Sequence, residues 1–391
     1  MKRITNILLF GLGLGLMPVS AHLFRGNPGQ PYKLESVDSL LPVKRVSTVM
    51  ASGNTSGDYN RYSFQRFSIP VTATVGKTKE GREIEAYYFP GKSPYRALVI
   101  GGMHGSELSS ITVAKEIIKK LSNGVQPYYS VLVIPVLFPD NAEAAVRNPK
   151  AMGGLQNIGR YTYKNSVDPN RQMPSPGKWH SEETCEDHMG RKIETENAIL
   201  LDLIRDFRPD RIANVHAIRD TSRAGIYADP RTDSKGIALG YESDSALAIR
   251  MADFIHRKGG NVLGNKITEK PSSLYYKDPV PVAKGKVQPR NFCGAKLPDN
   301  RGSGVSLGSW ASTAVENYPD PAYNRPAIRL FTIEFPGYRS PEFYTSSADQ
   351  LRSRQNVSLY AESVLEIFLG NYYPEYEEAE ASSWKHEFAN N

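Results

Sequence analysis

The feature that most constrains the fold of this chain is a regular alternation of short apolar runs with segments of helical periodicity. The runs RALVIGG, YYSVLVIPVLFPD, RIANVH and AIRLFTIEFPG each have the length and composition of a buried strand. Between the first two, apolar residues recur at helical spacing, at Ile111, Ala114, Ile118 and Leu121. This alternation predicts an α/β fold with a mixed, largely parallel central sheet and helices on both faces.

The first folded element predicted along the chain is a β-hairpin. Residues 67–91 contain two stretches of alternating apolar and polar residues, separated by a turn at Lys77–Gly81. Further along, helical periodicity predicts three longer helices, at Glu194–Asp206, Asp244–Lys258 and Ser346–Leu369. The core is therefore expected to extend from the hairpin to the last of these helices.

Four regions are expected along the 391 residues. Residues 1–21 have a basic start, an apolar run and a small-residue cleavage signal, which is typical of a signal peptide. The apolar run is too short to span a bilayer, so we expect a secreted, periplasmic protein without a membrane anchor after cleavage. The remaining regions are a loosely structured extension at 22–65, a folded domain at 66–370 and an acidic mobile tail at 371–391.

The charge pattern excludes one class of partner. The formal net charge is +7, and basic residues are scattered among acidic ones without a basic stripe or a nucleic-acid-binding motif. We therefore expect no nucleic acid partner. A mildly basic surface favours anionic surroundings such as cell-wall polymer, although the same charge also serves solubility alone.

The chain contains two cysteines, Cys185 and Cys293. In the oxidising compartment that a signal peptide implies, they could form a disulfide across a long loop. Two independent buried thiols fit the sequence equally well, so the pairing stays open.

His104 and Glu107 stand in the stretch IGGMHGSELSS, where a predicted strand ends and a predicted helix begins. Gly101 and Gly102 let the backbone turn sharply there, and open α/β sheets place their ligand sites at such edges. An imidazole and a carboxylate three residues apart can point at one centre, and this nitrogen and oxygen mixture suits zinc. Taken alone, the pair is more simply a surface pair or a helix-capping glutamate.

His216 and Glu334 can join this pair. His216 ends the run RIANVH and Glu334 lies within LFTIEFP, so parallel strands would bring both to the same sheet edge. Three of the four side chains would make an open zinc site, and a nearby carboxylate that is not a ligand can accept a proton. The alternatives are a hydrogen-bonded core histidine and a structural acid paired with a buried arginine, because an unpaired buried acid costs several kcal/mol.

With these residues identified, the sequence resembles the zinc carboxypeptidase superfamily, most closely its bacterial murein peptide amidase A-like branch. Short motifs match in the same order between about Val71 and Leu369. They are GREI, GGMHGSE, VDPNR, ANVH, GVSLGSWAS and TIEFP. The resemblance implies a zinc carboxypeptidase-like fold and a hydrolase with one zinc ion per chain.

The resemblance also implies a role for each matched residue. His104, Glu107 and His216 would bind the zinc ion, and Glu334 would be the catalytic base that activates water. Asp168, in VDPNR, would hold the far nitrogen of His104, a contact that usually supports metal affinity or activity.

Substrate-binding residues are implied by the same comparison. Asn170 and Arg171 would bind the terminal carboxylate of the substrate, since a guanidinium group matches a carboxylate with two hydrogen bonds. A loop with an ordinary salt bridge is the alternative. Arg147 would stabilise the oxyanion, but FPDNAEAAVRN departs from the family's Asn-Pro-Asp-Gly. Arg160 is therefore a rival, and either arginine could be purely structural.

The predicted function is a secreted zinc metallocarboxypeptidase or amidase that hydrolyses an amide bond next to a free carboxylate, in peptidoglycan stem peptides. Its partners would be a peptide or muropeptide substrate and the cell wall. One alternative is an N-acyl amino acid deacylase of the succinylglutamate desuccinylase/aspartoacylase type, which the signal peptide disfavours because those enzymes are cytosolic. The other is a catalytically silent cell-wall binding protein, which the complete set of four core residues disfavours.

Overall fold

A computed structural model describes residues 64–152, 157–162, 167–179, 185–240, 242–268, 284, 286 and 303–372. All of them belong to the second of the chain's two units, Val43–Asn391. The predicted signal peptide, the extension up to residue 63, the tail from residue 373 and Cys293 lie outside the described residues, so those expectations stay predictions.

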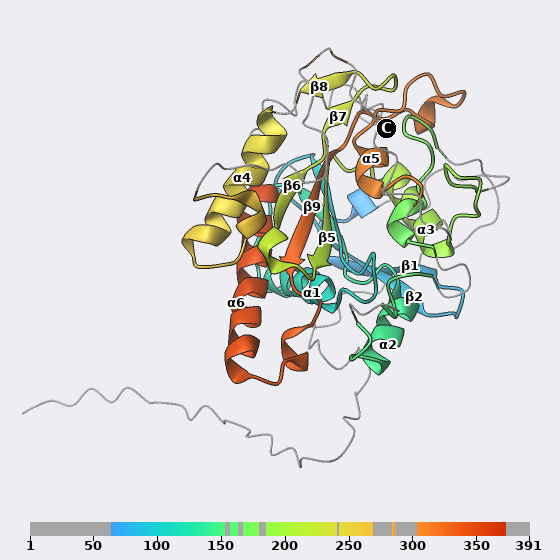
Figure 1. The fold of residues 1–391 in the computed structure, drawn as a ribbon. Coiled ribbons are helices and arrows are strands. Elements are labelled where there is room, and N and C mark those ends of the chain that lie inside the picture. The colour runs from blue at the N-terminus through green and yellow to red at the C-terminus, as the bar shows by residue number, and fades with distance from the viewer. Residues whose placement is uncertain are drawn as a thin grey trace, which may run out of the picture. The chain divides into compact units, whose positions relative to one another are not determined.

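The central sheet has seven strands in the order β1-β2-β4-β3-β5-β9-β6 (Figure 1). The four middle strands, from β4 to β9, run parallel, whereas β1, β2 and β6 pair antiparallel to their neighbours. A separate two-stranded ribbon consists of β7 and β8. The strands are β1 (Val71–Lys77), β2 (Glu83–Phe89), β3 (Arg96–Ile100), β4 (Ser130–Ile134), β5 (Arg211–Ile218), β6 (Gly225–Ala228), β7 (Arg231–Thr232), β8 (Ala238–Gly240) and β9 (Arg329–Pro336).

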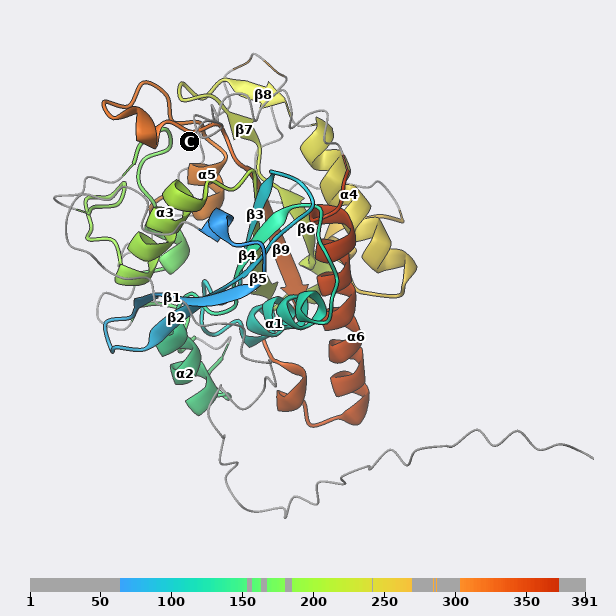
Figure 2. The same cartoon turned by 180° about the vertical axis from the view of Figure 1, so that it is seen from behind.

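Helices cover both faces of the sheet (Figures 1 and 2). Apolar side chains of α1, α4 and α6 pack in one core on one face, and those of α3 and α5 pack in a second core on the other. The helices are α1 (Leu108–Ser122), α2 (Pro139–Arg147), α3 (Thr195–Phe207), α4 (Glu242–Arg257), α5 (Leu307–Ala311) and α6 (Ser347–Ser363), which continues into a π-helical turn (Val364–Phe368). None of the helices in the described ranges is both long enough and apolar enough to cross a membrane.

Successive side chains of the middle strands point to opposite faces of the sheet, so each strand contributes apolar residues to both cores. On β5, Ala213 and Val215 face the core that contains α1, whereas Ile212 faces the core that contains α3. On β9, Ile333 faces the core that contains α1, and Leu330 faces the core that contains α3. A strand buried on both faces needs apolar residues at successive positions, which explains the continuous apolar runs of the sequence.

Strand register places the candidate residues at one edge. β3 pairs parallel with both β4 and β5, and β5 pairs parallel with β9, so the carboxyl ends of these strands meet. His216 and Glu334 are partners in the β5 and β9 register. The loop that carries His104 and Glu107 leaves β3 at the same edge.

The structure confirms the predicted fold class: a mixed sheet, parallel in its middle, between two layers of helices. The hairpin β1–β2 and the helices α1, α3, α4 and α6 lie where periodicity predicted them. Five short elements, α2, α5, β6, β7 and β8, were not predicted. They are two to nine residues long, which is too short for a clear periodic signal.

Candidate metal centre and active site

The loop between β3 and α1 carries two of the candidate ligands, and close packing determines its path. Gly102 has a φ of 62°, in the left-handed region that favours glycine. Gly105 lies against α2, where an added Cβ would be 2.2 Å from the backbone nitrogen of Ala142. The turn closes with a hydrogen bond of 3.0 Å from Glu107 N to His104 O. The backbone therefore holds both side chains at the start of α1.

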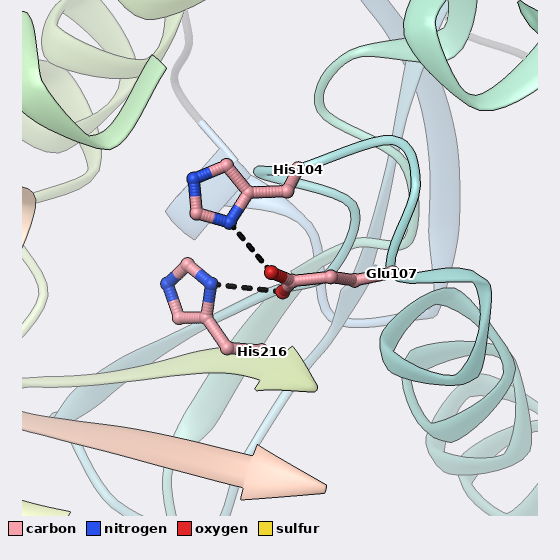
Figure 3. A group of neighbouring side chains, drawn as sticks. All are labelled: His104, Glu107 and His216. Carbon is pink, nitrogen blue, oxygen red and sulfur yellow. Dashed lines mark hydrogen bonds and ion pairs between the residues drawn. The ribbon is translucent and has the colours of Figure 1, made fainter. Parts of the chain in front are cut away.

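His104, Glu107 and His216 bring three donor groups together (Figure 3). Nδ1 of His104 lies 2.8 Å from Glu107 Oε1, and Nδ1 of His216 lies 3.1 Å from Glu107 Oε2. One donor atom from each residue lies within 4.8 Å of the other two. All three side chains are buried, so water competes little for these atoms.

Asp168 and Asn170 contact the far sides of the two imidazole rings. Asp168 Oδ1 lies 2.8 Å from Nε2 of His104 and accepts a hydrogen bond of 2.9 Å from the backbone N–H of Asn170. Nδ2 of Asn170 lies 3.4 Å from Nε2 of His216. A carboxylate on the far nitrogen of a histidine commonly orients that ring toward a metal. Asp168 has this position relative to His104.

The two candidate arginines have different surroundings. Arg160 Nη1 donates a hydrogen bond of 2.8 Å to Glu107 Oε1, and its Nη2 donates one of 3.2 Å to Asp168 Oδ2. Arg147 ends α2, its side chain is 70% exposed, and it forms an ion pair with Glu143. The structure therefore brings Arg160 to the candidate ligands, and it does not bring Arg147 there.

Glu334 lies beside the ligand set on the neighbouring strand. Because it pairs with His216 in register, both side chains leave the sheet on the same face. Burial raises the pKa of Glu334, and the carboxylate of Glu107 raises it further, whereas His216 lowers it. The candidate general base is half-buried and belongs to the same charged cluster as the three candidate ligands.

Charges within this cluster shift the pKa values of its members. Burial would raise the pKa of Asp168, but the positive charges of His104 and Arg160 hold it well below its usual range. Burial and Arg160 act to lower the pKa of His104, yet Glu107 and Asp168 raise it overall. Burial likewise opposes ionisation of Glu107, and the two histidines more than offset it. The cluster therefore favours the ionised forms of Asp168 and Glu107, whereas the pKa of Glu334 is raised.

The chemistry of the donor set fits a zinc ion. Two imidazole nitrogens and one carboxylate form a ligand set that catalytic zinc sites use, with a further position left open. In the part of the chain that the structure describes, no other group of three histidine, cysteine or acidic side chains converges in this way. His104, Glu107 and His216 are therefore the residues able to hold a metal.

Arg171, the candidate carboxylate-binding residue, lies in a short 3-10 turn (Pro169–Arg171) next to the ligand set. Its Nη1 donates a hydrogen bond of 2.6 Å to the carbonyl oxygen of Asn170, and its side chain is half-buried. The positive charge of this guanidinium group also helps to lower the pKa of Asp168.

Tyr338 is a residue of this region that the sequence motifs do not reveal. Its carbonyl oxygen accepts a hydrogen bond of 3.1 Å from Ser109 N, and the preceding Gly337 N donates one of 2.8 Å to Ile218 O. Burial raises the pKa of Tyr338, and Glu107 adds to that effect. Only its position four residues after Glu334 could have drawn attention to it.

Comparisons with known proteins give distant likenesses. No protein-family model matches the sequence, and no curated protein sequence matches it significantly. Carboxypeptidase A from Helicoverpa armigera is similar in structure, with 15% identity and a TM-score of 0.43, over 76% of this chain and 69% of that chain. Bovine thrombin-activatable fibrinolysis inhibitor, in complex with tick carboxypeptidase inhibitor, has 13% identity and a TM-score of 0.45, over 76% and 89%.

A third similar structure is a candidate succinylglutamate desuccinylase/aspartoacylase from Shewanella frigidimarina. It has 13% identity and a TM-score of 0.41, over 78% of this chain and 73% of that chain. At these TM-scores the activities and ligands of the three proteins do not transfer to this chain.

Proposed function

We propose that this protein is a zinc-dependent metallocarboxypeptidase or amidase that hydrolyses an amide bond next to a free carboxylate. The observation that carries the proposal is the convergence of His104, Glu107 and His216, with Glu334 in register beside them. Three ligands and a separate carboxylate are the protein groups that metal-assisted hydrolysis requires.

In the proposed reaction, a zinc ion held by the three ligands supplies Lewis acidity at the substrate carbonyl and lowers the pKa of water. Glu334 accepts a proton at its carboxylate during attack and later donates it to the leaving amine. Asp168 keeps the ring of His104 in place through the 2.8 Å contact to Nε2. The chain's own groups thereby orient the ligand and move the proton.

Two arginines complete the proposed chemistry. Arg160, which contacts Glu107 and Asp168, is better placed than Arg147 to stabilise negative charge on the carbonyl oxygen. Asn170 and Arg171 would bind the terminal carboxylate of the substrate.

Peptidoglycan stem peptides are the proposed substrates, and the proposed location is periplasmic. The support is in the sequence: an N-terminal signal-peptide pattern, a net charge of +7 that favours anionic surroundings, and motifs that resemble those of murein peptide amidases. Cell-wall association belongs to the same proposal.

The test is to incubate the zinc-loaded protein with purified muropeptides and with a general peptide library, and to identify the cleaved bond by mass spectrometry. We expect hydrolysis of an amide bond adjacent to a free carboxylate. Cleavage confined to N-acyl amino acids would favour a deacylase instead. A protein that takes up no zinc and cleaves nothing would be a binding protein, contrary to the proposal.

The carboxylate requirement can be tested separately with Arg171→Ala. The variant should keep its zinc and bind free-acid substrates more weakly, because each lost charge-assisted hydrogen bond contributes about 1.5 to 3 kcal/mol. Amidated substrates should show no such difference. Arg352→Ala removes a mostly exposed guanidinium group elsewhere and serves as the control. Equal cleavage of amidated and free-acid forms by the unaltered protein would contradict the assignment.

A further inference from the structure

The Pro169–Arg171 turn and the residue before it carry three of the residues proposed to act in hydrolysis: Asp168, Asn170 and Arg171. Within the turn, the N–H of Arg171 donates a hydrogen bond of 2.9 Å to the carbonyl oxygen of Asp168. This bond fixes the N–H side of Arg171. A partner for its carbonyl oxygen must come from another part of the chain, because the turn is too short to satisfy all of its own backbone groups.

Arg191 is such a partner. Its Nη2 donates hydrogen bonds of 2.7 Å to the carbonyl oxygen of Arg171 and of 2.8 Å to that of Ser303. Gly304 lies against the same carbonyl group, since an added Cβ would be 2.1 Å from Arg171 O, and its φ of 126° is one that favours glycine. One guanidinium group therefore joins the Pro169–Arg171 turn to the segment around Ser303.

A buried carboxylate determines the direction of the Arg191 side chain. Oδ2 of Asp187 accepts a hydrogen bond of 2.7 Å from Nε of Arg191. Its Oδ1 accepts bonds of 2.8 Å and 2.9 Å from the backbone N–H groups of Met189 and Arg191. The side chain of Asp187 is fully buried, and that of Arg191 is 21% exposed. With so many charge-assisted bonds, this pair has little freedom to reorient.

Backbone hydrogen bonds extend the same junction beyond Arg191. Met173 N donates a bond of 3.1 Å to Val305 O, and His188 N donates one of 3.1 Å to Met173 O. Met173 and Val305 are both fully buried. Three segments that are separate in sequence therefore meet in the protein interior, and Arg191 is the side chain that connects them.

We propose that Arg191 holds the Pro169–Arg171 turn in the position from which Arg171 binds the terminal carboxylate of the substrate. Arg191 acts through the backbone of Arg171 rather than by contact with the substrate. A two-bond contact between a guanidinium group and a carboxylate requires both to be aligned, and a displacement of about 1 Å can remove much of its benefit. The inference rests on the proposed function and adds the residue on which its preference for a free carboxylate depends.

The first test measures hydrogen exchange of the turn by mass spectrometry, in the purified full-length protein without substrate. Arg191→Lys keeps a positive charge beside Asp187 but lacks the planar fork that donates to several oxygens at once. Amide hydrogens between Asp168 and Met173 should exchange about tenfold or more faster in this variant. Unchanged exchange would overturn the inference.

Arg205→Lys is the matched control for this measurement. Arg205 lies on α3, its side chain is 18% exposed, and its Nε lies 2.9 Å from a buried carboxylate oxygen of Asp206. The substitution therefore changes a similar half-buried ion pair outside the junction. Exchange between Asp168 and Met173 should be the same as in the unaltered protein.

The second test compares the free-acid and amidated forms of the peptide or muropeptide that the unaltered protein cleaves best. Arg191→Lys should raise KM for the free acid about tenfold and leave kcat and zinc content nearly normal, because binding lost equally from ground state and transition state changes KM alone. KM for the amide should not change. Equal losses on both forms would show a general structural defect and would contradict the inference.

Two further variants examine whether Arg191 acts through Arg171. The double variant Arg171→Ala/Arg191→Lys should have the KM of Arg171→Ala alone, because no guanidinium group is left to displace. Gly304→Ala crowds the same carbonyl oxygen and should raise the free-acid KM as Arg191→Lys does, in preparations whose thermal melts show a folded protein. Effects of Arg171→Ala and Arg191→Lys that add in full would overturn the inference, as would a normal KM in both Arg191→Lys and Gly304→Ala.

Hydrogen exchange separates this inference from the proposed function, because it requires no substrate. Faster exchange in Arg191→Lys, in a protein that hydrolyses nothing, would refute the proposed function and leave the contact between Arg191 and the turn established. Hydrolysis with a free-acid preference that Arg191→Lys does not change would leave the proposed function standing and refute the inference.

Discussion

At the scale of single residues, one carboxylate organises the candidate metal centre. Oε1 of Glu107 contacts both His104 Nδ1 and Arg160 Nη1, and Oε2 contacts His216 Nδ1 and accepts a hydrogen bond from Ala217 N. Because both oxygens have two neighbours, the orientation of this side chain is strongly determined. Single substitutions around Glu107 can distinguish residues that bind zinc, accept a proton or stabilise the oxyanion.

His216→Ala should abolish tight zinc binding, because only two of the three donor groups would remain. The zinc content per chain, measured by mass spectrometry after dialysis, should fall from about one to well below one. His256→Ala removes an imidazole from the last turn of α4, outside the cluster, and should leave the content unchanged. Unaltered zinc in His216→Ala would remove this residue from the ligand set.

Glu334→Gln should fold and bind zinc like the unaltered protein and lose nearly all turnover, because the amide keeps the shape and cannot accept a proton. Loss of a general base lowers rates by roughly 100 to 10,000-fold. A thermal melt and a rate on the same preparation provide the measurement. A lowered melting point with a near-normal rate per folded molecule would show a structural acid instead.

Arg160→Ala and Arg147→Ala should differ sharply in kcat/KM. Arg160 contacts two carboxylates of the cluster, so its removal should cost on the order of 100-fold, as for other donors that stabilise an oxyanion. Arg147 is mostly exposed beside Glu143, so its removal should change the rate little. The opposite ranking would assign the oxyanion to Arg147.

At the scale of elements, the sequence predicted those with long periodic signals. The helix expected at Glu194–Asp206 is observed at Thr195–Phe207, within one residue at each end. The five residues of α5 (Leu307–Ala311) give no comparable signal, because so short a helix does not repeat its apolar positions often enough to show a period. Its position depends on tertiary contacts, such as the hydrogen bond from Leu307 N to Asn170.

The candidate site, too, could be predicted from the sequence only in part. The positions of His104, His216 and Glu334 at strand ends could be predicted, because parallel strands bring their carboxyl ends to one edge. The choice between Arg147 and Arg160 could not be made, because it depends on where a loop of irregular backbone returns to the cluster. Local propensity carries no information on such a return.

The loop before α1 gives a prediction at this scale. Gly105→Ala would place a Cβ 2.2 Å from Ala142 N, so the loop or α2 must shift. We expect a loss of about 1 to 3 kcal/mol in the free energy of unfolding and weaker zinc binding, because His104 and Glu107 flank the glycine. Urea denaturation and zinc content provide the measurements.

Gly124→Ala is the matched control for Gly105→Ala. Gly124 follows α1 with a φ of 98° and has open space around its Cβ position. It should cost about 1 kcal/mol through backbone strain and leave zinc binding intact. Equal zinc affinity in both variants would show that the loop tolerates the shift.

At the scale of the described domain, buried charges join elements that are distant in sequence. Asp244, in the first turn of α4, lies 2.6 Å from Arg231 Nε on β7 and forms an ion pair with Arg329 on β9. All three side chains are buried. A buried carboxylate between two arginines is stable only while it is ionised, so this junction should respond to pH independently of the candidate metal centre.

Burial acts to raise the pKa of Asp244, but Arg329 and Arg231 lower it below its usual value. Because the pKa in the folded state is below that of the unfolded chain, about 3.9, the ionised carboxylate stabilises the fold above that pH. The contribution is lost as the pH falls through the folded-state value.

Asp244→Asn should therefore lower the free energy of unfolding by about 3 to 5 kcal/mol at pH 7, because it leaves two buried arginines without their carboxylate. The difference from the unaltered protein should shrink as the pH falls below about 4. Urea denaturation at neutral and acidic pH measures it, with Asp349→Asn as an exposed control. A difference that stays constant over this pH range would mean that ionisation of Asp244 does not stabilise the junction, and it would contradict the prediction.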